Sequence, residues 1–328
     1  MTVTTLASAN DVSINTFHHC RAALGDRVLR LQDEPLAILK GLYRLGALVV
    51  TTFADGARVS QSMRYPALLD NEICLESRGE QCRLSQQLNL PLWHSVMAVL
   101  APVADLPARS LLFFDRYGAP VQQMAVAPET GGLAFEELVC AMLHPDQRQL
   151  GSPPPRHYRF AGPPAVAELE RQWSQLDDDG FRDLVAALGD RREVFYQAVR
   201  DKFACPVRIE TVPALLALAG QRQYGVTVCT GNHGVRLCLS APWSPPRWQK
   251  GHCHLAHNGV LVSLDMGRVA SVWRLRRPGP GRVVTALEGL DAQGRWLWTL
   301  SAGDDEDAWL ALLSESLIRE GAPGQRMA

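Results

Sequence analysis

The sequence repeats itself, and this repeat constrains the fold more than any other feature. The segment His94–Pro102 aligns with Ala270–Pro278, 176 positions further along (94 to 270), and the alignment continues without a gap to the turn at Asp115–Gly118, which meets Asp291–Gly294. Similarity sustained at one offset indicates that a structural unit is present twice. We therefore predict two similar halves rather than two unrelated domains.

Each half has the same predicted order of elements: a helical lead-in, several strands with short turns, and a closing helix. Short β-branched or apolar runs predict strands at 49–53, 110–114, 226–230 and 283–287. Apolar residues at helical spacing predict helices at 133–144, 165–176, 181–188 and 306–319. Strands joined by short turns pair antiparallel, so we predict an α+β fold with an internal duplication, in which each half has an antiparallel sheet and flanking helices.

A proline-rich stretch marks the boundary between the halves. The residues Gly151–Pro155, Gly-Ser-Pro-Pro-Pro, can continue neither a helix nor a central strand and indicate a stiff linker. We place the first repeat at 1–150, the second at 151–320 and a disordered tail at 321–328.

Composition excludes several classes of protein. The chain has 328 residues, of which 47% are hydrophobic and 20% charged, as in a globular protein with an ample core. A net charge of -1 provides no long-range positive field to attract nucleic acid or an anionic membrane. The first residues lack a basic start followed by an apolar run, and no stretch of about 18 apolar residues occurs. We therefore predict a cytoplasmic protein without membrane insertion.

Cysteine usage agrees with that compartment. Eight cysteines are scattered along the chain without a Cys-x-x-Cys pair. In a chain of this length without an export signal, we expect reduced and mostly buried thiols.

Three segments form an ordered set of motifs. The run Ser263–Pro278 carries an Ala-x-x-Trp core that leads to a basic residue and a proline. The run Arg109–Gly118 has the form Arg-Ser-Leu-x-Phe-Phe-Asp-x-x-Gly, and Gly231–Gly234 is a Gly-Asn-x-Gly turn. In order and spacing these segments resemble the haem-utilisation family, which includes hemin-degrading factors and haem-trafficking proteins. The resemblance covers nearly the whole chain and agrees with the duplicated fold of that family.

The resemblance implies haem in a cleft between the sheet of the second half and a helix near the start of that half, with an axial histidine on the helix. Haem is a large apolar disc with two carboxylates, so its site needs an apolar slot with Arg or Lys at the rim. By the resemblance, Arg109 lies across the distal face, Arg277 occupies the basic-Pro position, and Arg191 is a second propionate partner.

Two features of these arginines follow from the residues alone. An arginine that begins a strand, such as Arg109, equally suits a solvated position that protects a sheet edge. Along the predicted strand, Arg274 and Arg276 share one face and Arg277 lies on the other. Such a cluster is suited to binding an anion.

The axial histidine is missing where the resemblance would place it. The corresponding residues are Asp177–Gly180, and none of them is His. The three aspartates are explained better as an N-cap for a helix that begins near Phe181 than as iron ligands. Three alternatives follow: haem with another ligand, a different tetrapyrrole or breakdown product, or a relative without haem function.

The resulting hypothesis is a cytoplasmic haem-binding protein of haem uptake and iron acquisition that holds imported haem or passes it on. Its partners would be haem or a related tetrapyrrole, and a haem importer or a haem oxygenase. The alternatives are a haem-degrading enzyme that releases iron, or a diverged homologue that has lost haem binding. The missing histidine weakens the degrading activity most, because iron chemistry depends on a defined axial ligand.

The stretch Gly251–Gly259 is rich in histidine and cysteine. If it forms a hairpin, His252 and His254 share one face and His257 lies near the turn. This makes His254 and His257 candidate ligands for a metal ion, or replacement ligands for haem iron. The alternative is a polar hairpin with solvent-facing histidines, and the spacing matches no standard zinc motif.

Overall fold

The computed structural model describes residues 25–68, 74–78, 82–102, 106–127, 132–147, 154, 165–176, 180–181, 183–185, 190–279 and 282–321. Three of the segments discussed above lie outside these residues: the linker, except Pro154; the three aspartates at 177–179; and the tail beyond Gly321. Among the described helices, none combines the length and the apolar character that a membrane span requires.

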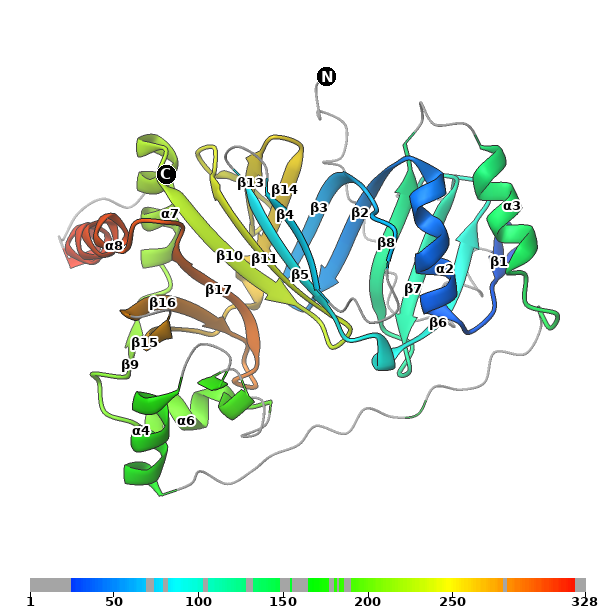
Figure 1. Ribbon diagram of the computed structural model, residues 1–328. Coiled ribbons are helices and arrows are strands. Elements are labelled where there is room, and N and C mark those ends of the chain that lie inside the picture. Colours follow the sequence, from blue (N-terminus) through cyan, green and yellow to red (C-terminus); the bar gives the residue numbers. More distant parts are fainter. Residues whose placement is uncertain are drawn as a thin grey trace.

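The described strands form two antiparallel sheets (Figure 1). The first contains, in spatial order, β1 (Val28–Arg30), β6 (Trp93–Val99), β7 (Ser110–Asp115), β8 (Pro120–Val126), β2 (Ala47–Ala54), β3 (Ala57–Arg64), β14 (Val260–Asp265), β13 (His252–His257) and β12 (Arg247–Gln249). The second contains β4 (Cys74–Arg78), β5 (Arg83–Leu88), β11 (Val235–Pro242), β10 (Gly225–Gly231), β17 (Trp296–Ala302), β16 (Arg282–Leu290), β15 (Ser271–Gly279) and β9 (Ala204–Val207).

Helices flank these sheets and confirm most of the predicted boundaries. They are α2 (Pro35–Gly41), α3 (Leu133–Ala141), α4 (Val166–Gln175), α6 (Arg192–Ala198), α7 (Thr211–Arg222) and α8 (Glu306–Gly321). The 3-10 turns are η1 (Gly25–Arg27), η2 (Leu42–Leu45), η3 (Leu90–Leu92) and η4 (Met266–Arg268). The helix α3 ends before the predicted residue 144, because Leu143 leaves it to form a β-bridge with Leu31. Of the predicted helix at 181–188, the described residues 181 and 183–185 are helical.

The order of the strands confirms the internal duplication. The first sheet runs β1-β6-β7-β8-β2-β3, and the second runs β9-β15-β16-β17-β10-β11 in the same relative order. The repeated turn is built the same way twice. Asp115 Oδ1 accepts hydrogen bonds from the backbone N–H groups of Tyr117 and Ala119, and Asp291 Oδ1 accepts them from Gln293 and Arg295. An aspartate that caps its own turn explains why this position matches in both copies.

The two halves exchange strands. The hairpin β4–β5 of the first half completes the second sheet through pairing of Arg83–Leu88 with Val235–Ser240. In return, β14 of the second half pairs with β3 and carries β13 and β12 into the first sheet. The repeat predicts the two units but not this exchange. Each sheet is therefore completed by strands of the other half.

The two sheets and two helices share one apolar core. Strands β3, β13 and β14 of the first sheet contribute residues such as Val59, Leu255 and Leu264, and the second sheet contributes Leu237 and Trp298. Helices α7 and α8 pack against the same side of the second sheet. The helices α2 and α3 cover the first sheet instead, in a separate cluster. Trp298 is fully buried in this core.

The expectation of reduced and mostly buried cysteines is wrong at several positions. Cys229 and Cys238 are joined by a disulfide between β10 and β11, and Cys74 and Cys140 are exposed. Cys253 is buried, as expected. The error has a physical reason: the spacing of Cys229 and Cys238 suggests no pairing, but a hairpin places them directly opposite each other in neighbouring strands.

The Gly-Asn-x-Gly turn joins the halves. The side-chain amide of Asn232 donates to the carbonyl oxygens of Phe53 (2.6 Å) and Val121 (2.9 Å) in the first half. Its Oδ1 accepts from the backbone N–H groups of Gly234 and Val235, at 2.8 and 2.9 Å. The Asn232 side chain thus stabilises the turn and binds it to two strands of the first half.

We expect Asn232→Ala to lower the free energy of unfolding by about 2–4 kcal/mol, because it removes four hydrogen bonds, two to carbonyls of the first half and two from N–H groups of the turn. Urea denaturation followed by circular dichroism measures this change. The control is Gln249→Ala, which shortens an exposed amide side chain on β12 and should change stability by less than about 0.5 kcal/mol. Equal stabilities for the two variants would contradict the role of Asn232.

Candidate functional site

The second sheet has one closed face and one partly open face. Side chains alternate along β5, β10 and β11, so every second residue points away from the shared core. Cross-strand register places the outward residues side by side. We call this surface the open face; its half-buried or exposed members are Ser85, Gln87, Thr227, Arg236, Cys238 and Ser240.

Helices α4 and α6 cover the other end of the same face. Trp273 and Leu275 of β15 point to this side and pack with Trp173 of α4 and Phe195 and Tyr196 of α6. Figure 1 shows both helices beside β15 and β16, away from β5. The helices therefore form a wall next to the open face.

A buried carboxylate anchors α6 to the sheet. Glu288 of β16 is 5% exposed and accepts hydrogen bonds from Arg192 Nη1 (2.9 Å) and from the Tyr196 hydroxyl (2.6 Å). Its second oxygen accepts from Thr299 Oγ1 at 3.0 Å, and Thr299 accepts in turn from Trp296 Nε1 at 2.8 Å. This network fixes the position of the wall relative to the sheet.

The network also sets the ionisation of its members. Burial tends to raise the pKa of Glu288, but the charges of Arg192 and Arg277 and the Tyr196 hydrogen bond outweigh it and lower the pKa. Burial and the nearby Glu288 charge raise the pKa of Tyr196 well above its ordinary value. Glu288 is therefore an anion at neutral pH, and Tyr196 remains a neutral donor.

Three arginines gather around this network. The guanidinium carbons of Arg192 and Arg236 lie 4.9 and 6.0 Å from the centre of the Trp296 ring. Arg277 shares the sheet face of Glu288 and acts on its charge. The site thus combines an aromatic surface with guanidinium groups, which suits an apolar molecule that carries acid groups.

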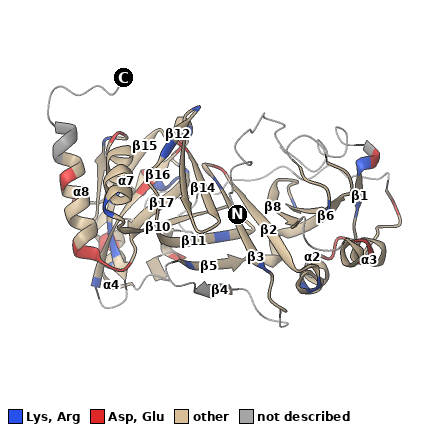
Figure 2. Ribbon diagram, turned by 90° about the horizontal axis from the view of Figure 1, so that it is seen from above, with Lys and Arg blue, Asp and Glu red and all other residues tan. Residues whose placement is uncertain are grey.

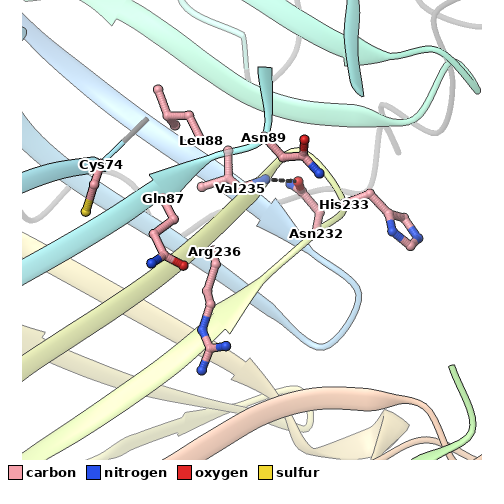
Figure 3. A pocket seen from close by; sticks show the side chains of 8 residues that line it. All are labelled: Cys74, Gln87, Leu88, Asn89, Asn232, His233, Val235 and Arg236. Atoms are coloured by element: carbon pink, nitrogen blue, oxygen red, sulfur yellow. Dashed lines mark hydrogen bonds between the residues drawn. The ribbon is translucent and has the colours of Figure 1, made fainter. Parts of the chain in front are cut away.

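A pocket of about 380 Å³ lies at the edge of the open face, where β5 meets the β10–β11 turn. Its lining residues are Cys74, Gln87, Leu88, Asn89, Asn232, His233, Val235 and Arg236. Figure 3 shows Gln87 and Arg236 projecting side by side from adjacent strands, whereas His233 lies on the turn and points away from Arg236. The pocket therefore continues the open face beyond Arg236.

Among the described residues, only the second sheet has an open face of this kind. By the repeat, Leu112 corresponds to Glu288 and Met97 to Trp273. Leu112 and Met97 belong to a small apolar cluster with Val28 and Phe114, all almost fully buried. The equivalent face of the first sheet is therefore closed by apolar packing where the second carries its charged network.

The structure separates Arg109 from the other predicted arginines. Arg109 precedes β7, and Figure 1 shows β7 and β15, the strand of Arg277, at opposite ends of the molecule. Its guanidinium lies against Gly132, where a Cβ atom would come within 2.5 Å of it. This contact is at the start of α3 in the first half.

Arg191 and Arg277 lie closer to the site. Arg191 is exposed at the residue before α6, whereas the next residue, Arg192, reaches Glu288. Arg277 lies on the face opposite Arg274 and Arg276, as the alternation predicted. The sequence analysis missed Arg192, Arg236 and Glu288, because only the strand order brings these three together.

The histidine-rich stretch is the predicted hairpin. The rings of His252 and His254 stack 6.1 Å apart on one face, and burial together with His252 lowers the pKa of His254. His257 lies on the other face, with Nε2 3.0 Å from Asn258 Nδ2. In the part of the chain that the structure describes, no three His, Cys, Asp or Glu side chains are grouped to hold a metal ion. The assignment of His254 and His257 as metal ligands stays a prediction.

Charged residues are spread over both halves (Figure 2). The described part of α8 carries red segments, including its acidic start at Glu306 and Asp307, whereas blue segments lie on strands such as β11. This distribution agrees with the near-zero net charge. The arginines of the second sheet therefore form a local feature and are not part of a large basic surface.

The duplicated α+β fold is also the fold of a known heme-binding protein. No family model matches the chain. In sequence, it is 24% identical over 297 residues to the hemin transport protein HmuS of Yersinia pestis, covering 89% of this chain and 84% of HmuS. The family resemblance is thereby confirmed.

Solved structures share the fold. Holo-PhuS, a heme-binding protein from Pseudomonas aeruginosa, superimposes with a TM-score of 0.79 at 20% identity, covering 90% of this chain and 89% of PhuS. The heme oxygenase ChuS from E. coli gives a TM-score of 0.78 at 21% identity, with 93% of each chain covered. The chain is a relative of HmuS and has the fold of PhuS and ChuS.

We expect Glu288→Gln to destabilise the protein by about 3 kcal/mol at neutral pH, because it leaves Arg192 without its buried counter-charge. Folding lowers the pKa of Glu288, so its stabilisation is present above the unfolded value, about 4.3, and is lost as the pH falls through the lower native pKa. The stability difference between the two proteins should therefore shrink in acid.

Urea denaturation between neutral and acidic pH measures this difference. Glu136→Gln, on the exposed side of α3, is the matched control and should follow the unmodified protein throughout. A constant penalty for Glu288→Gln down to the lowest pH would contradict the ionised state of this carboxyl.

Proposed function

We propose that this protein binds haem, or a closely related tetrapyrrole, on the open face of the second sheet beside α6. The observation that carries the proposal is the group of Arg192, Arg236 and Arg277 around Trp296 and Glu288 on one sheet face. Sequence similarity to a hemin transport protein supports the same ligand class.

The residues present fit this ligand chemically. Haem offers a flat apolar surface and two carboxylates, and arginine binds carboxylates with charge-assisted, often bidentate hydrogen bonds. Arg236 and Arg277 are the propionate partners that we propose, while Arg192 is held by Glu288. Trp296 and the apolar wall of α4 and α6 would contact the macrocycle.

We favour a carrier over a haem-degrading enzyme. The region in which the resemblance expects an axial histidine has none; its last residue, Gly180, is helical and has no side chain to coordinate iron. Degradation depends on a defined iron ligand, whereas holding and transferring a tetrapyrrole requires chiefly a complementary surface. The role we propose is to receive imported haem in the cytoplasm and pass it to a haem oxygenase or another acceptor.

Titration of the purified protein with hemin tests the proposal. We expect a shifted Soret band that saturates at one equivalent. A spectrum identical to that of free hemin at every ratio would reject haem binding and leave a homologue that keeps the fold without the ligand. Bleaching of the bound Soret band on addition of a reductant would instead favour the degrading enzyme.

Arginine variants locate the ligand. Arg236→Ala and Arg277→Ala should each weaken hemin binding by about 10- to 100-fold, because each removes a charge-assisted hydrogen bond. Arg109→Ala is the informative comparison: the resemblance assigns Arg109 to the distal face, but its contact with Gly132 predicts unchanged affinity. Weakening by Arg109→Ala alone would contradict a site on the second sheet.

A further inference from the structure

The disulfide lies on the floor of the candidate site. Cys229 and Cys238 are directly opposite each other in β10 and β11, with their Cα atoms 4.1 Å apart. In register, Cys238 pairs with Ser85 of β5, and Cys229 pairs with Thr299 of β17. Because cross-strand partners share a face, both sulfur atoms are on the side of Arg236 and Glu288.

Cys229 and Cys238 differ in their exposure to solvent. Cys238 is half-buried on the open face, two residues from Arg236, which lines the pocket. Figure 3 shows Arg236 directed away from the turn along this face. Cys229 is only 5% exposed. A molecule on the open face would therefore meet Cys238 before Cys229.

A cysteine sulfur in this site is a candidate ligand for haem iron, where the expected axial histidine is missing. A cysteine thiolate is an established ligand of haem iron, whereas a disulfide has lost the anionic sulfur that coordinates metal. The residues that correspond to the expected axial histidine contain none, and His233 points away from Arg236. The reduced pair would place a soft, anionic donor on the same face as the arginines.

We propose, resting on the proposed haem-binding function, that Cys238 is the iron ligand and that Cys229 is its oxidative partner. A dithiol reductant transfers two electrons and two protons to the disulfide, giving two cysteine thiols, and itself becomes a disulfide. The Cys238 thiol then loses its proton to solvent as the sulfur binds ferric iron. Oxidation of the pair removes the ligand, so axial ligation depends on the redox state of the protein.

The first measurement concerns the protein without haem. Alkylation of the denatured chain should count two more thiols after reduction than before, and Cys229→Ser should abolish this gain. No gain in the unmodified protein would overturn the redox part of the proposal, because Cys229 and Cys238 would then not be joined.

The second measurement is spectroscopic. The full chain is reduced with dithiothreitol, which is removed under argon because thiols themselves ligate iron, and hemin is then added. We expect a thiolate signature, in the ferric electron paramagnetic resonance spectrum and the ferrous–carbonyl Soret band, only after reduction. Cys229→Ser should show it in both states and Cys238→Ser in neither. Cys140→Ser, an exposed position of α3, should behave as the unmodified protein.

The outcomes separate this inference from the proposed function. Saturable hemin binding with the same spectrum in all variants and both redox states would overturn the ligand assignment and leave haem binding intact. Failure of the unmodified protein to bind hemin in either state would overturn both. Circular dichroism of the serine variants verifies that a lost signature does not reflect a lost fold.

Discussion

The pairing of β5 with β11 is the interaction on which the site depends. It draws Arg83–Leu88 of the first half into the sheet of the second, so that Gln87 stands beside Arg236 on one face. The reciprocal pairing of β14 with β3 and the two Asn232 hydrogen bonds across the interface hold the halves in this register. A shift of one residue in this pairing would turn the outward side chains of β5, such as Gln87, into the core. The exchange therefore fixes both the fold and the surface on which we propose that haem binds.

The two repeats agree at some positions and differ at others, and each case has a physical reason. Asp115 and Asp291 cap the same turn with the same pair of backbone hydrogen bonds, which shows how closely the two units agree where geometry is demanding. The units differ where one of them carries a site. Leu112 is buried among apolar side chains, whereas its counterpart Glu288 is buried among an arginine, a tyrosine and a threonine. A carboxylate is costly to bury without such partners, so this network is what allows Glu288 to be buried as an anion.

Local patterns predicted the units of this fold, but pairing between distant strands determined the site. The repeat, the helix at 306–319 and the opposite faces of Arg276 and Arg277 follow from spacing alone. Nothing in the spacing of Cys229 and Cys238 predicts that they meet, nor that Arg192 rather than Arg191 turns inward. Those contacts depend on which strands become neighbours and on where α6 begins. The family resemblance supplied the ligand class, but the residues it assigned are spread over both halves.

The proposed site places a flat apolar molecule with acid groups on the open face of the second sheet. A crystal structure of the protein grown with hemin, measured at the iron absorption edge, would locate this molecule. We expect an anomalous iron peak over β10 and β11, with macrocycle density between Arg236 and Arg277. An iron peak on the first sheet or at the hairpin of His252 and His254, with the open face empty, would contradict it.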